Sequence, residues 1–305
     1  MSTYYKILPE DLVCRGFQYH EGLNIDKNTI DEYECSYGLH FSDTKHIFNF
    51  CGYGSIIAEV ELPEDAIVYH FDDKSKADKI ILKNLRPLWS VETIEALMQD
   101  VEFKPNELIH EAIRNDYLDV VKYLIEQCTD AHECYYYELC DACENGSLDV
   151  VKYLIEQGAD IHSRDDFAIR WTSICGRLDI VKYLVEQGAD IHASDDYALR
   201  IASESGYSDI VKCLVEHGAN IHADDDYALR WASDGGYFDI VKYLVEQGAN
   251  IHASDDVALQ WASYKGHLDV VKYLVEHGAD IHADNDSAIN FTGTPEIKAY
   301  LNSLL

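Results

Sequence analysis

Basic residues are scarce in this sequence. Lysine and arginine number 24 of the 305 residues, against 56 aspartates and glutamates, and the formal net charge is −32. Residues 1–104 carry 10 basic and 19 acidic side chains, and residues 105–305 carry 14 and 37. Because such a surface repels phosphate groups, we expect the protein to bind neither nucleic acid nor an anionic membrane. A protein partner with a basic patch would instead be steered towards it.

Long apolar runs and disulfide patterns are also absent from the sequence. No apolar stretch approaches the roughly 20 residues of a membrane-spanning helix, and the first residues lack the basic-then-apolar order of a signal peptide. The nine cysteines are odd in number and unevenly spaced, which excludes a disulfide framework and favours a reducing compartment. We therefore expect a soluble, intracellular protein, most simply a cytoplasmic one.

Catalytic signatures are missing as well. The sequence contains no P-loop, no Gly-x-Ser-x-Gly, no glycine-rich dinucleotide turn and no His-Glu-x-x-His. Each of these motifs places a nucleophile, a phosphate cradle or a metal in a defined local structure. Their absence predicts a protein that is not an enzyme and takes no cofactor.

What the sequence has in abundance is a repeat of 30 residues. The motif Asp-Ile/Val-Val-Lys-Tyr/Cys-Leu starts at Asp119, Asp149, Asp179, Asp209, Asp239 and Asp269. A second motif, Gly-Ala-Asp/Asn-Ile-His, starts at Gly158, Gly188, Gly218, Gly248 and Gly278. A fixed period of this size predicts a stacked array of repeats.

One repeat predicts two short helices and a connection. Asp196 is placed to cap a first helix over Tyr197–Ser203, and Gly206 allows the left-handed turn that ends it. In the second helix the apolar positions recur at helical spacing, at Ile210, Val211, Leu214 and Val215. We expect Ala219–Asp224 to run extended to the next repeat. Since two short helices cannot bury this apolar stripe alone, neighbouring repeats must cover it.

These residues resemble the ankyrin repeat. The resemblance is carried by Tyr197-Ala-Leu-Arg-x-Ala, Gly266-His267, Val270-Val271 and Gly278-Ala279-Asp280, and it extends from about Pro105 to Leu301. The period is shorter than the family's usual length of about 33, and the missing residues fall at the hairpin tip. The short form is similar to the large ankyrin families of giant amoeba-infecting viruses. The resemblance implies a monomeric protein-interaction scaffold, in the host cytoplasm if the protein is viral.

The predicted fold is mainly α, an ankyrin-repeat solenoid of helix pairs with short hairpins, preceded by a small α+β domain. We place that N-terminal domain at 1–90, a linker helix at 91–104 and a degenerate first repeat at 105–132. Regular repeats follow at 133–162, 163–192, 193–222, 223–252 and 253–282, and a truncated C-terminal cap at 283–305. The degenerate early repeat suits either a cap or a dock for the N-terminal domain.

The N-terminal region reads as short strands. We expect them at Phe17–His20, Ile56–Leu62, Ala66–Phe71 and Asp78–Leu85, with Pro63-Glu64-Asp65 joining the second and third as a hairpin. Ser90 should cap the linker helix over Val91–Met98. Two alternatives give this region a function of its own. Leu8-Pro-Glu-Asp-Leu12 could open an F-box, a ubiquitin-ligase adaptor, or a pocket with converging polar groups could carry an enzymatic activity.

Three groups of residues could bind metal. The first comprises Cys35, His40, His46 and Cys51, whose side chains suit zinc but whose spacing matches no recognised finger. The second comprises Cys134, Cys140 and Cys143, where the slot of Cys143 later holds serine and indicates packing. The third is a ladder of histidines, one per repeat, at His162, His192, His222, His252 and His282. Stacked repeats lie about 10 Å apart, too far for one ion, so we expect a local hydrogen bond at each histidine.

The partner-binding surface is predicted from differences among repeats. Packing requires the same residue in every repeat, whereas selective contact requires different ones. The variable positions lie at the end of the first helix and in the adjoining turn, and tryptophan, tyrosine and arginine are enriched at interface hot spots. The predicted partner-binding residues are Arg170, Trp171, Arg200, Tyr207, Arg230, Trp231, Tyr237, Trp261, Tyr264 and His267. The alternative is that the tryptophans pack along the stack and the arginines bridge to aspartates of adjacent hairpins.

Overall fold

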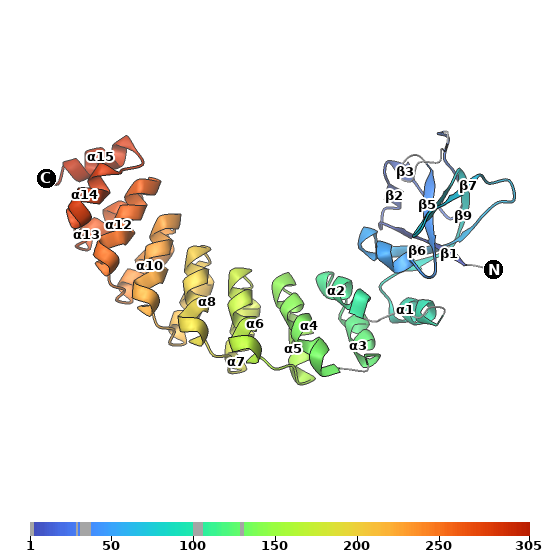
Figure 1. Ribbon diagram of the computed structural model, residues 1–305, viewed down its shortest axis with the longest axis horizontal. Helices are drawn as coiled ribbons and strands as arrows, with labels where there is room; N and C mark the ends of the chain where they lie inside the picture. The colour runs from blue at the N-terminus through green and yellow to red at the C-terminus, as the bar shows by residue number, and fades with distance from the viewer. Residues whose placement is uncertain (1–2, 29, 31–37, 100–105, 129–130) are drawn as a thin grey trace. The chain divides into compact units, whose positions relative to one another are not determined.

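The chain forms two compact units, residues 1–134 and residues 135–305. The structure is a computed structural model that describes residues 3–28, 30, 38–99, 106–128 and 131–305. The first unit contains a β-sheet, a 3-10 helix and three α-helices, and the second is a row of helix pairs (Figure 1). Among the described residues, no helix is long and apolar enough to cross a membrane.

The first unit is built on an antiparallel sheet of seven strands in the order β4-β9-β6-β1-β5-β8-β7, with β2 and β3 forming a separate ribbon. The strands are β1 (Tyr4–Leu8), β2 (Val13–Cys14), β3 (Phe17–Gln18), β4 (Gly22–Ile25), β5 (Leu39–Asp43), β6 (Ile56–Glu61), β7 (Val68–His70), β8 (Ser75–Ala77) and β9 (Lys79–Pro87). A 3-10 helix, η1 (Ile47–Tyr53), follows β5. The core of this sheet includes Leu8, Leu39, Ile80 and Leu82, each at most 1% exposed.

The predicted strands are present, but one predicted pairing is wrong. The strand Ile56–Glu61 does not form a hairpin with the strand that follows it. Instead β6 pairs with β1 on one edge and with β9 on the other, so that neither edge is left for β7. β7 pairs with β8. The strongly apolar β6 therefore lies inside the sheet, where both of its edges are hydrogen-bonded.

Helices follow the sheet in the first unit, and the first of them begins at Val91, as the sequence predicts. They are α1 (Val91–Met98), α2 (Asn106–Arg114) and α3 (Leu118–Glu126). The Ser90 hydroxyl caps α1 by accepting the Thr93 N–H at 3.3 Å. Within this unit α2 packs against η1 and α1 against α3, and the Trp89 ring stacks on Tyr117 with centroids 5.3 Å apart. The degenerate first repeat thus docks against the sheet domain, one of the two roles expected for it.

The second unit alternates first and second helices of successive repeats. The first helices are α4 (Ala131–Asn145), α6 (Ser163–Ile174), α8 (Ala193–Glu204), α10 (Ala223–Gly235), α12 (Ala253–Lys265) and α14 (Ala283–Asn290). The second helices are α5 (Leu148–Glu156), α7 (Leu178–Glu186), α9 (Ser208–Glu216), α11 (Phe238–Glu246), α13 (Leu268–Glu276) and α15 (Pro295–Asn302). Within this unit the connections from one repeat to the next lie along the outer edge of an arc (Figure 1).

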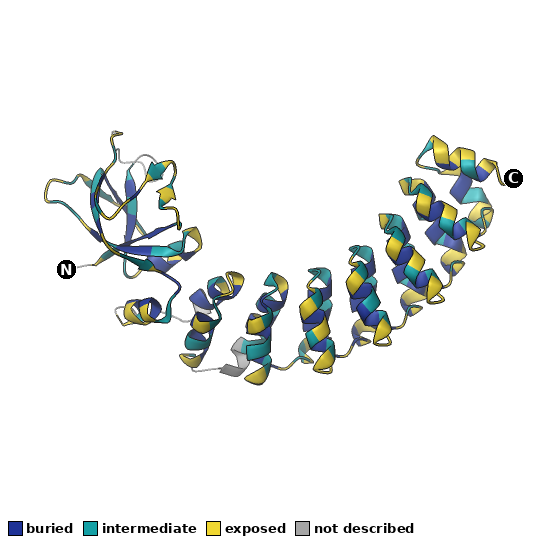
Figure 2. Ribbon diagram, turned by 180° about the vertical axis from the view of Figure 1, so that it is seen from behind, coloured by how far each residue is buried: buried dark blue, intermediate teal, exposed yellow. Residues whose placement is uncertain are grey.

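The apolar stripe of each second helix is buried, as predicted. Val211 and Leu214 of α9 have no exposed surface and Ile210 is 1% exposed, while Val215 is partly buried. On the first helix α8, Leu199 and Ala202 also have no exposed surface. First helices pack on first helices and second helices on second helices along the row. The buried faces therefore point between helices, whereas the exposed residues lie on the outside of each pair (Figure 2). This confirms that neighbouring repeats cover what one repeat cannot.

The connection between repeats differs from the extended segment that the sequence predicts. The Asn220 side chain accepts the His222 N–H at 3.0 Å, which makes a tight turn. The same connection continues through three consecutive residues with left-handed backbone angles. They are Asp224, Asp225 and Asp226, with φ of 50°, 56° and 54°. Aspartate tolerates this region better than most residues. The hairpin tip is therefore a short left-handed coil.

The prediction that Asp196 caps the first helix of its repeat is also wrong. Asp196 has φ 53° and ψ 36°, whereas an N-cap residue is extended. Its buried carboxylate accepts the main-chain N–H of Asn220, in the following connection, at 2.7 Å. Asp166, Asp226 and Asp256 make the same bond to the residue 24 positions later. These aspartates tie one repeat to the next rather than capping their own helix.

Candidate functional site

Each histidine of the ladder contacts an aspartate of its own repeat. His192 Nδ1 lies 3.0 Å from Asp196 Oδ1, and the other four histidines make the equivalent contact with the residue four positions on. The imidazole thus orients the carboxylate that bonds the next repeat. The local hydrogen bond expected at each histidine is confirmed, and no group of three potential metal ligands occurs among the described residues.

The predicted arginines are bound to the hairpins. Arg170 and Arg230 donate to carbonyl oxygens five and six residues earlier, at 2.7–2.8 Å. Gln260, in the same slot, donates to the Asp255 carbonyl at 2.6 Å. Arg200 also donates to its own Ser194 carbonyl, at 3.2 Å, and in addition its guanidinium pairs with Asp224 of the following hairpin at 2.5 Å. The bridge to an adjacent hairpin is therefore present at one arginine, while all three stabilise the left-handed coil of their own repeat.

The tryptophan slot forms an interrupted aromatic row. Trp231 and Trp261 meet edge to face with centroids 5.2 Å apart, and Tyr227 stacks on Trp231 at 5.4 Å. Trp171 stacks on Phe167 at 5.3 Å and donates its ring N–H to Glu144 at 3.3 Å. All three tryptophans are half-buried. They pack along the row and keep part of each ring at the surface.

One member of this row was missed by reasoning from the sequence. Phe291 lies 30 residues after Trp261 and so occupies the same slot, although its repeat is truncated. The side chain is 66% exposed. Counting the period past the last regular repeat would have found it.

The turn residues Tyr207, Tyr237 and His267 lie against the preceding turn. The Tyr207 ring covers Gly176 so closely that a Cβ on this glycine would lie 2.6 Å from it, and Tyr237 covers Gly206 in the same way. His267 covers Gly236 and its Nε2 lies 2.8 Å from the Asp234 carbonyl oxygen. These predicted contact residues therefore also pack one repeat on another.

Tyr264 is the most exposed of the predicted residues. Its side chain is 63% exposed at the end of α12. In the equivalent slot Glu204 accepts a hydrogen bond from Tyr227 at 2.6 Å, and Asp234 pairs with Lys265 at 3.5 Å. The repeat that contains Tyr264 thus presents an aromatic ring where its neighbours present carboxylates.

The predicted cysteine and histidine groups are placed as follows. Cys35 lies outside the described residues. His46 Nδ1 contacts Asp43 at 2.8 Å, and Cys51 is buried, which raises the pKa of its thiol to about 11. Cys143 is fully buried, as its packing interpretation requires, and its pKa is raised to about 12 by burial. Cys140 is partly buried, and the side chain of Cys134 is not described.

The F-box interpretation of Leu8-Pro-Glu-Asp-Leu12 is wrong. Leu8 ends strand β1, and the Leu12 N–H bonds the Pro9 carbonyl at 3.0 Å in a turn. The short strands β2, β3 and β4 follow, where an F-box requires helices. Gly16 and the polar residues after it cannot supply the apolar helix face that the motif needs.

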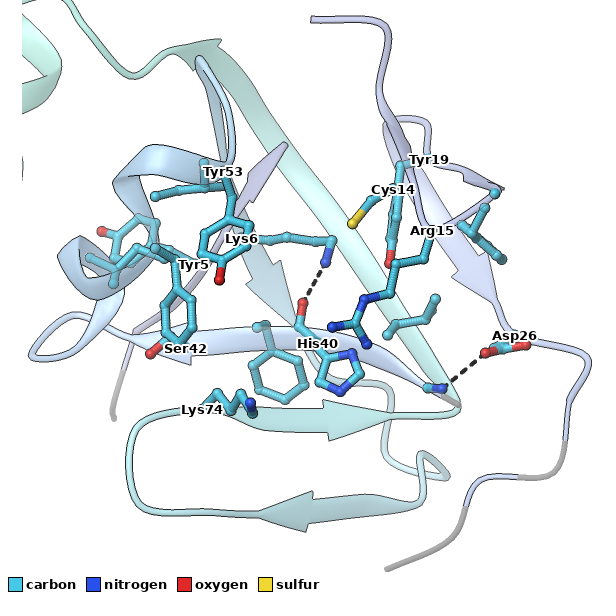
Figure 3. Close-up of a pocket in the computed structure, with 18 of the residues that line it drawn as sticks. Tyr5, Lys6, Cys14, Arg15, Tyr19, Asp26, His40, Ser42, Tyr53 and Lys74 are labelled. Carbon is cyan, nitrogen blue, oxygen red and sulfur yellow. Dashed lines mark hydrogen bonds between the residues drawn. The ribbon is translucent and has the colours of Figure 1, made fainter. Parts of the chain in front are cut away.

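The N-terminal sheet contains a cavity of about 490 Å³ (Figure 3). It opens where two neighbouring strands separate. β1 pairs with β6 from Tyr4 to Leu8, but with β5 only at Tyr4 and Tyr5. From Leu39 to Phe41, β5 pairs with β8 on its other edge. Polar side chains from several elements line the opening, the feature expected if this domain has an activity of its own.

Lys6 is the most buried charged side chain of the cavity. It is 5% exposed, its Nζ donates to the His40 carbonyl at 2.5 Å, and it lies 4.5 Å from the centre of the Tyr19 ring. Removal from water lowers the pKa of Lys6 to about 8, and the charge of Arg15 contributes in the same direction. Burial raises the pKa of Tyr19, so this phenol stays protonated. Figure 3 shows the Lys6 and Arg15 side chains directed towards His40.

Comparison with known proteins agrees with the repeat geometry. Residues 90–285 match the ankyrin repeat family in five overlapping stretches. The chain belongs to the ankyrin repeat family. Ankyrin repeats generally mediate protein–protein interactions and are generally not enzymes. Residues 2–92 match a second family, described as a domain of unknown function (DUF7666). The two matches overlap only at residues 90–92.

The relatives are ankyrin repeat proteins of Acanthamoeba polyphaga mimivirus, in agreement with the viral resemblance. The chain is 31% identical to ankyrin repeat protein R838 over 150 residues, which cover 42% of this chain and 54% of R838. It is 30% identical to ankyrin repeat protein R868 over 135 residues, which cover 41% of this chain and 67% of R868. The matches therefore span about half of R838 and about two thirds of R868.

Proposed function

We propose that the repeat array is a non-enzymatic scaffold that binds a protein partner at the ends of its first helices and their adjoining turns. The anchors are Trp231, Trp261 and Tyr264, continued by Phe291. The observation that carries the proposal is the 63% exposure of Tyr264 on the helix that also supplies Trp261. Half-buried tryptophans and an exposed tyrosine are the side chains that most often provide binding energy at protein interfaces.

The hairpin contacts support this placement. The tips are short coils whose carbonyl oxygens are bonded to Arg170 and Arg230, and this leaves the hairpins little freedom to reach a partner. The arginine guanidinium groups also lie over aromatic rings; Arg200 Cζ, for example, is 5.1 Å from the centre of the Tyr227 ring. Side chains held in this way lose less conformational entropy when a partner binds.

The charge of the array indicates the chemistry of its partner. Residues 105–305 carry 37 acidic and 14 basic side chains, and many aspartates lie at exposed hairpin positions. We propose a partner with a basic patch, bound by a monomer in the cytoplasm, which is the host's if the protein is viral. We propose neither nucleic acid nor an anionic membrane as a partner, because the same charge would repel the phosphates of both.

Truncating the aromatic anchors should abolish most of the binding. A partner is first isolated from host-cell lysate with the intact chain and identified by mass spectrometry. We expect Trp261→Ala and Tyr264→Ala each to weaken its binding by about 2 kcal/mol or more, the loss typical of a hot spot. Binding is measured by calorimetry, and a thermal melt checks the fold of each variant.

Asp255→Ala is the matched control, because Asp255 is an exposed hairpin residue of the same repeat. It should change the affinity by less than about 0.5 kcal/mol. The placement of the site is wrong if the hairpin variant alone weakens binding while both aromatic variants fold and bind as the unchanged chain does.

Recruitment by charge should appear in the association rate. We expect the rate constant to fall about tenfold or more between low and high salt, because salt screens the attraction between exposed charges. The dissociation rate should change much less, since contacts within the bound interface are less screened. Stopped-flow mixing at several ionic strengths measures both. An association rate that stays constant across the series contradicts electrostatic recruitment.

A further inference from the structure

The cavity of the N-terminal sheet contains a buried amine. Lys6 lines this cavity from strand β1 and is only 5% exposed. Figure 3 shows its amine among the lining side chains, near those of Cys14 and Tyr19. We propose that Lys6 captures a small aromatic aldehyde in this cavity by forming an imine with it. The inference concerns the sheet domain and does not depend on which partner the repeat array binds.

Lys6 pairs with no carboxylate within the described part of the chain. Its Nζ donates to the His40 main-chain carbonyl oxygen at 2.5 Å and lies 4.5 Å from the centre of the Tyr19 ring. Burial raises the pKa of the Tyr19 phenol, so this ring supplies no negative charge either. A buried ammonium group without an opposite charge is costly, and the loss of its proton removes that cost. The surroundings of Lys6 therefore favour the neutral amine.

The neutral amine is the form that attacks a carbonyl group. Burial lowers the pKa of Lys6 to about 8. At pH 8 about half of this side chain is then neutral, whereas an exposed lysine with a pKa near 10.4 is neutral in about 0.4% of molecules. Desolvated lysines of this kind are the ones that form imines in proteins. The hydrogen bond to His40 uses one N–H and leaves the nitrogen lone pair for the attack.

The proposed reaction needs no reactant besides the aldehyde. The lone pair of Lys6 Nζ forms a bond to the carbonyl carbon, and the π electrons of the C=O bond move to the oxygen. The nitrogen loses a proton and the oxygen gains one, which gives a carbinolamine. The second nitrogen proton and the hydroxyl group then leave together as water, and a C=N double bond remains. Neither group is oxidised or reduced, so the capture is reversible by water.

The aromatic side chains of the lining favour an aldehyde that carries a flat ring. Phe17 and Tyr19 form a ring pair with centroids 4.7 Å apart, and Phe50 and Tyr53 form another at 6.1 Å. Tyr53 is 73% exposed, so its ring can contact a bound molecule. Stacked and edge-to-face contacts favour a further aromatic ring beside such pairs. The volume of about 490 Å³ lies in the range of small-molecule sites.

The test uses the full chain, benzaldehyde as the probe and cyanoborohydride, which reduces each imine to a stable amine. Peptide mass spectrometry then gives the labelling rate of every lysine. Lys83 is the internal reference, because it lies on the same sheet but its side chain is 52% exposed, pairs with Glu61 and is not part of the lining. At pH 8 we expect Lys6 to be labelled at least about tenfold faster than Lys83, since far more of it is neutral.

Two further comparisons separate the cavity from ordinary lysine chemistry. The ratio of Lys6 to Lys83 labelling should fall about tenfold or more from pH 8 to pH 10, where Lys6 gains little and an exposed lysine becomes neutral. With propanal, which has no ring, the ratio at pH 8 should be about two- to tenfold smaller. The proposal is overturned if Lys6 is labelled no faster than Lys83, if pH leaves the ratio unchanged, or if propanal gives an equal ratio. All three ratios come from the unchanged chain, so no variant has to fold.

Discussion

Leu214→Ala is expected to lower the free energy of unfolding of the array by about 2–5 kcal/mol, the cost of leaving a cavity in a packed core. Leu214 has no exposed surface and lies on α9 between neighbouring second helices. In a stacked array each repeat is stabilised mainly by its neighbours, so a loss at one interface weakens both adjoining repeats. Urea denaturation followed by circular dichroism measures the change.

Glu216→Ala on the same helix is the control, since Glu216 is exposed. Its effect should stay within about 0.5 kcal/mol. Equal stability of the Leu214 variant and the unchanged chain would mean that the apolar stripe does not hold the repeats together.

Gly206→Ala is expected to cost about 2–4 kcal/mol, because two effects add. Gly206 has φ +82°, which an alanine adopts only with strain, and its Cβ would lie 2.6 Å from the Tyr237 ring. Gly218 has a similar φ of +98° but open space around a Cβ. Gly218→Ala should therefore show the backbone cost alone, about 1–2 kcal/mol.

Combining Gly206→Ala with Tyr237→Ala separates the two effects. Without the ring, adding alanine at Gly206 should cost no more than it does at Gly218, because only the backbone strain remains. Chemical denaturation measures the free energy of unfolding of Gly206→Ala, Gly218→Ala, Tyr237→Ala and the Gly206→Ala/Tyr237→Ala double variant. If the cost at Gly206 is the same with and without Tyr237, the ring does not cover the turn as described.

The repeat was predictable because its signals are local. Capping at Ser90, the helices of each pair and the buried stripe around Leu214 all follow from residues within one turn or one helix. The histidine ladder was interpreted correctly for the same reason, since His192 and Asp196 are four residues apart. A pattern that recurs every 30 residues also predicts stacking, because each repeat exposes the same apolar stripe and a neighbouring repeat can cover it.

The failures arise where the partner is distant in sequence. Asp196 looks like a cap but bonds the N–H of Asn220, and Tyr207 looks like a variable surface residue but covers Gly176 of the preceding turn. These contacts depend on the offset between stacked repeats, which sequence periodicity does not specify. Variation at such a turn position therefore reports packing as well as contact with a partner.

The sequence by itself determined the repeat family, the acidic charge and the order of the helices. Only the tertiary structure decided that β6 lies between β1 and β9, and that β1 and β5 separate beside Lys6. At the cavity Lys6 contacts His40, 34 residues later, on strands β1 and β5, which pair directly only at Tyr4 and Tyr5. Strand order and strand separation depend on packing across the whole sheet, so no local sequence pattern predicts the cavity. A helix pair, in contrast, is specified by the apolar spacing and turn residues within each repeat.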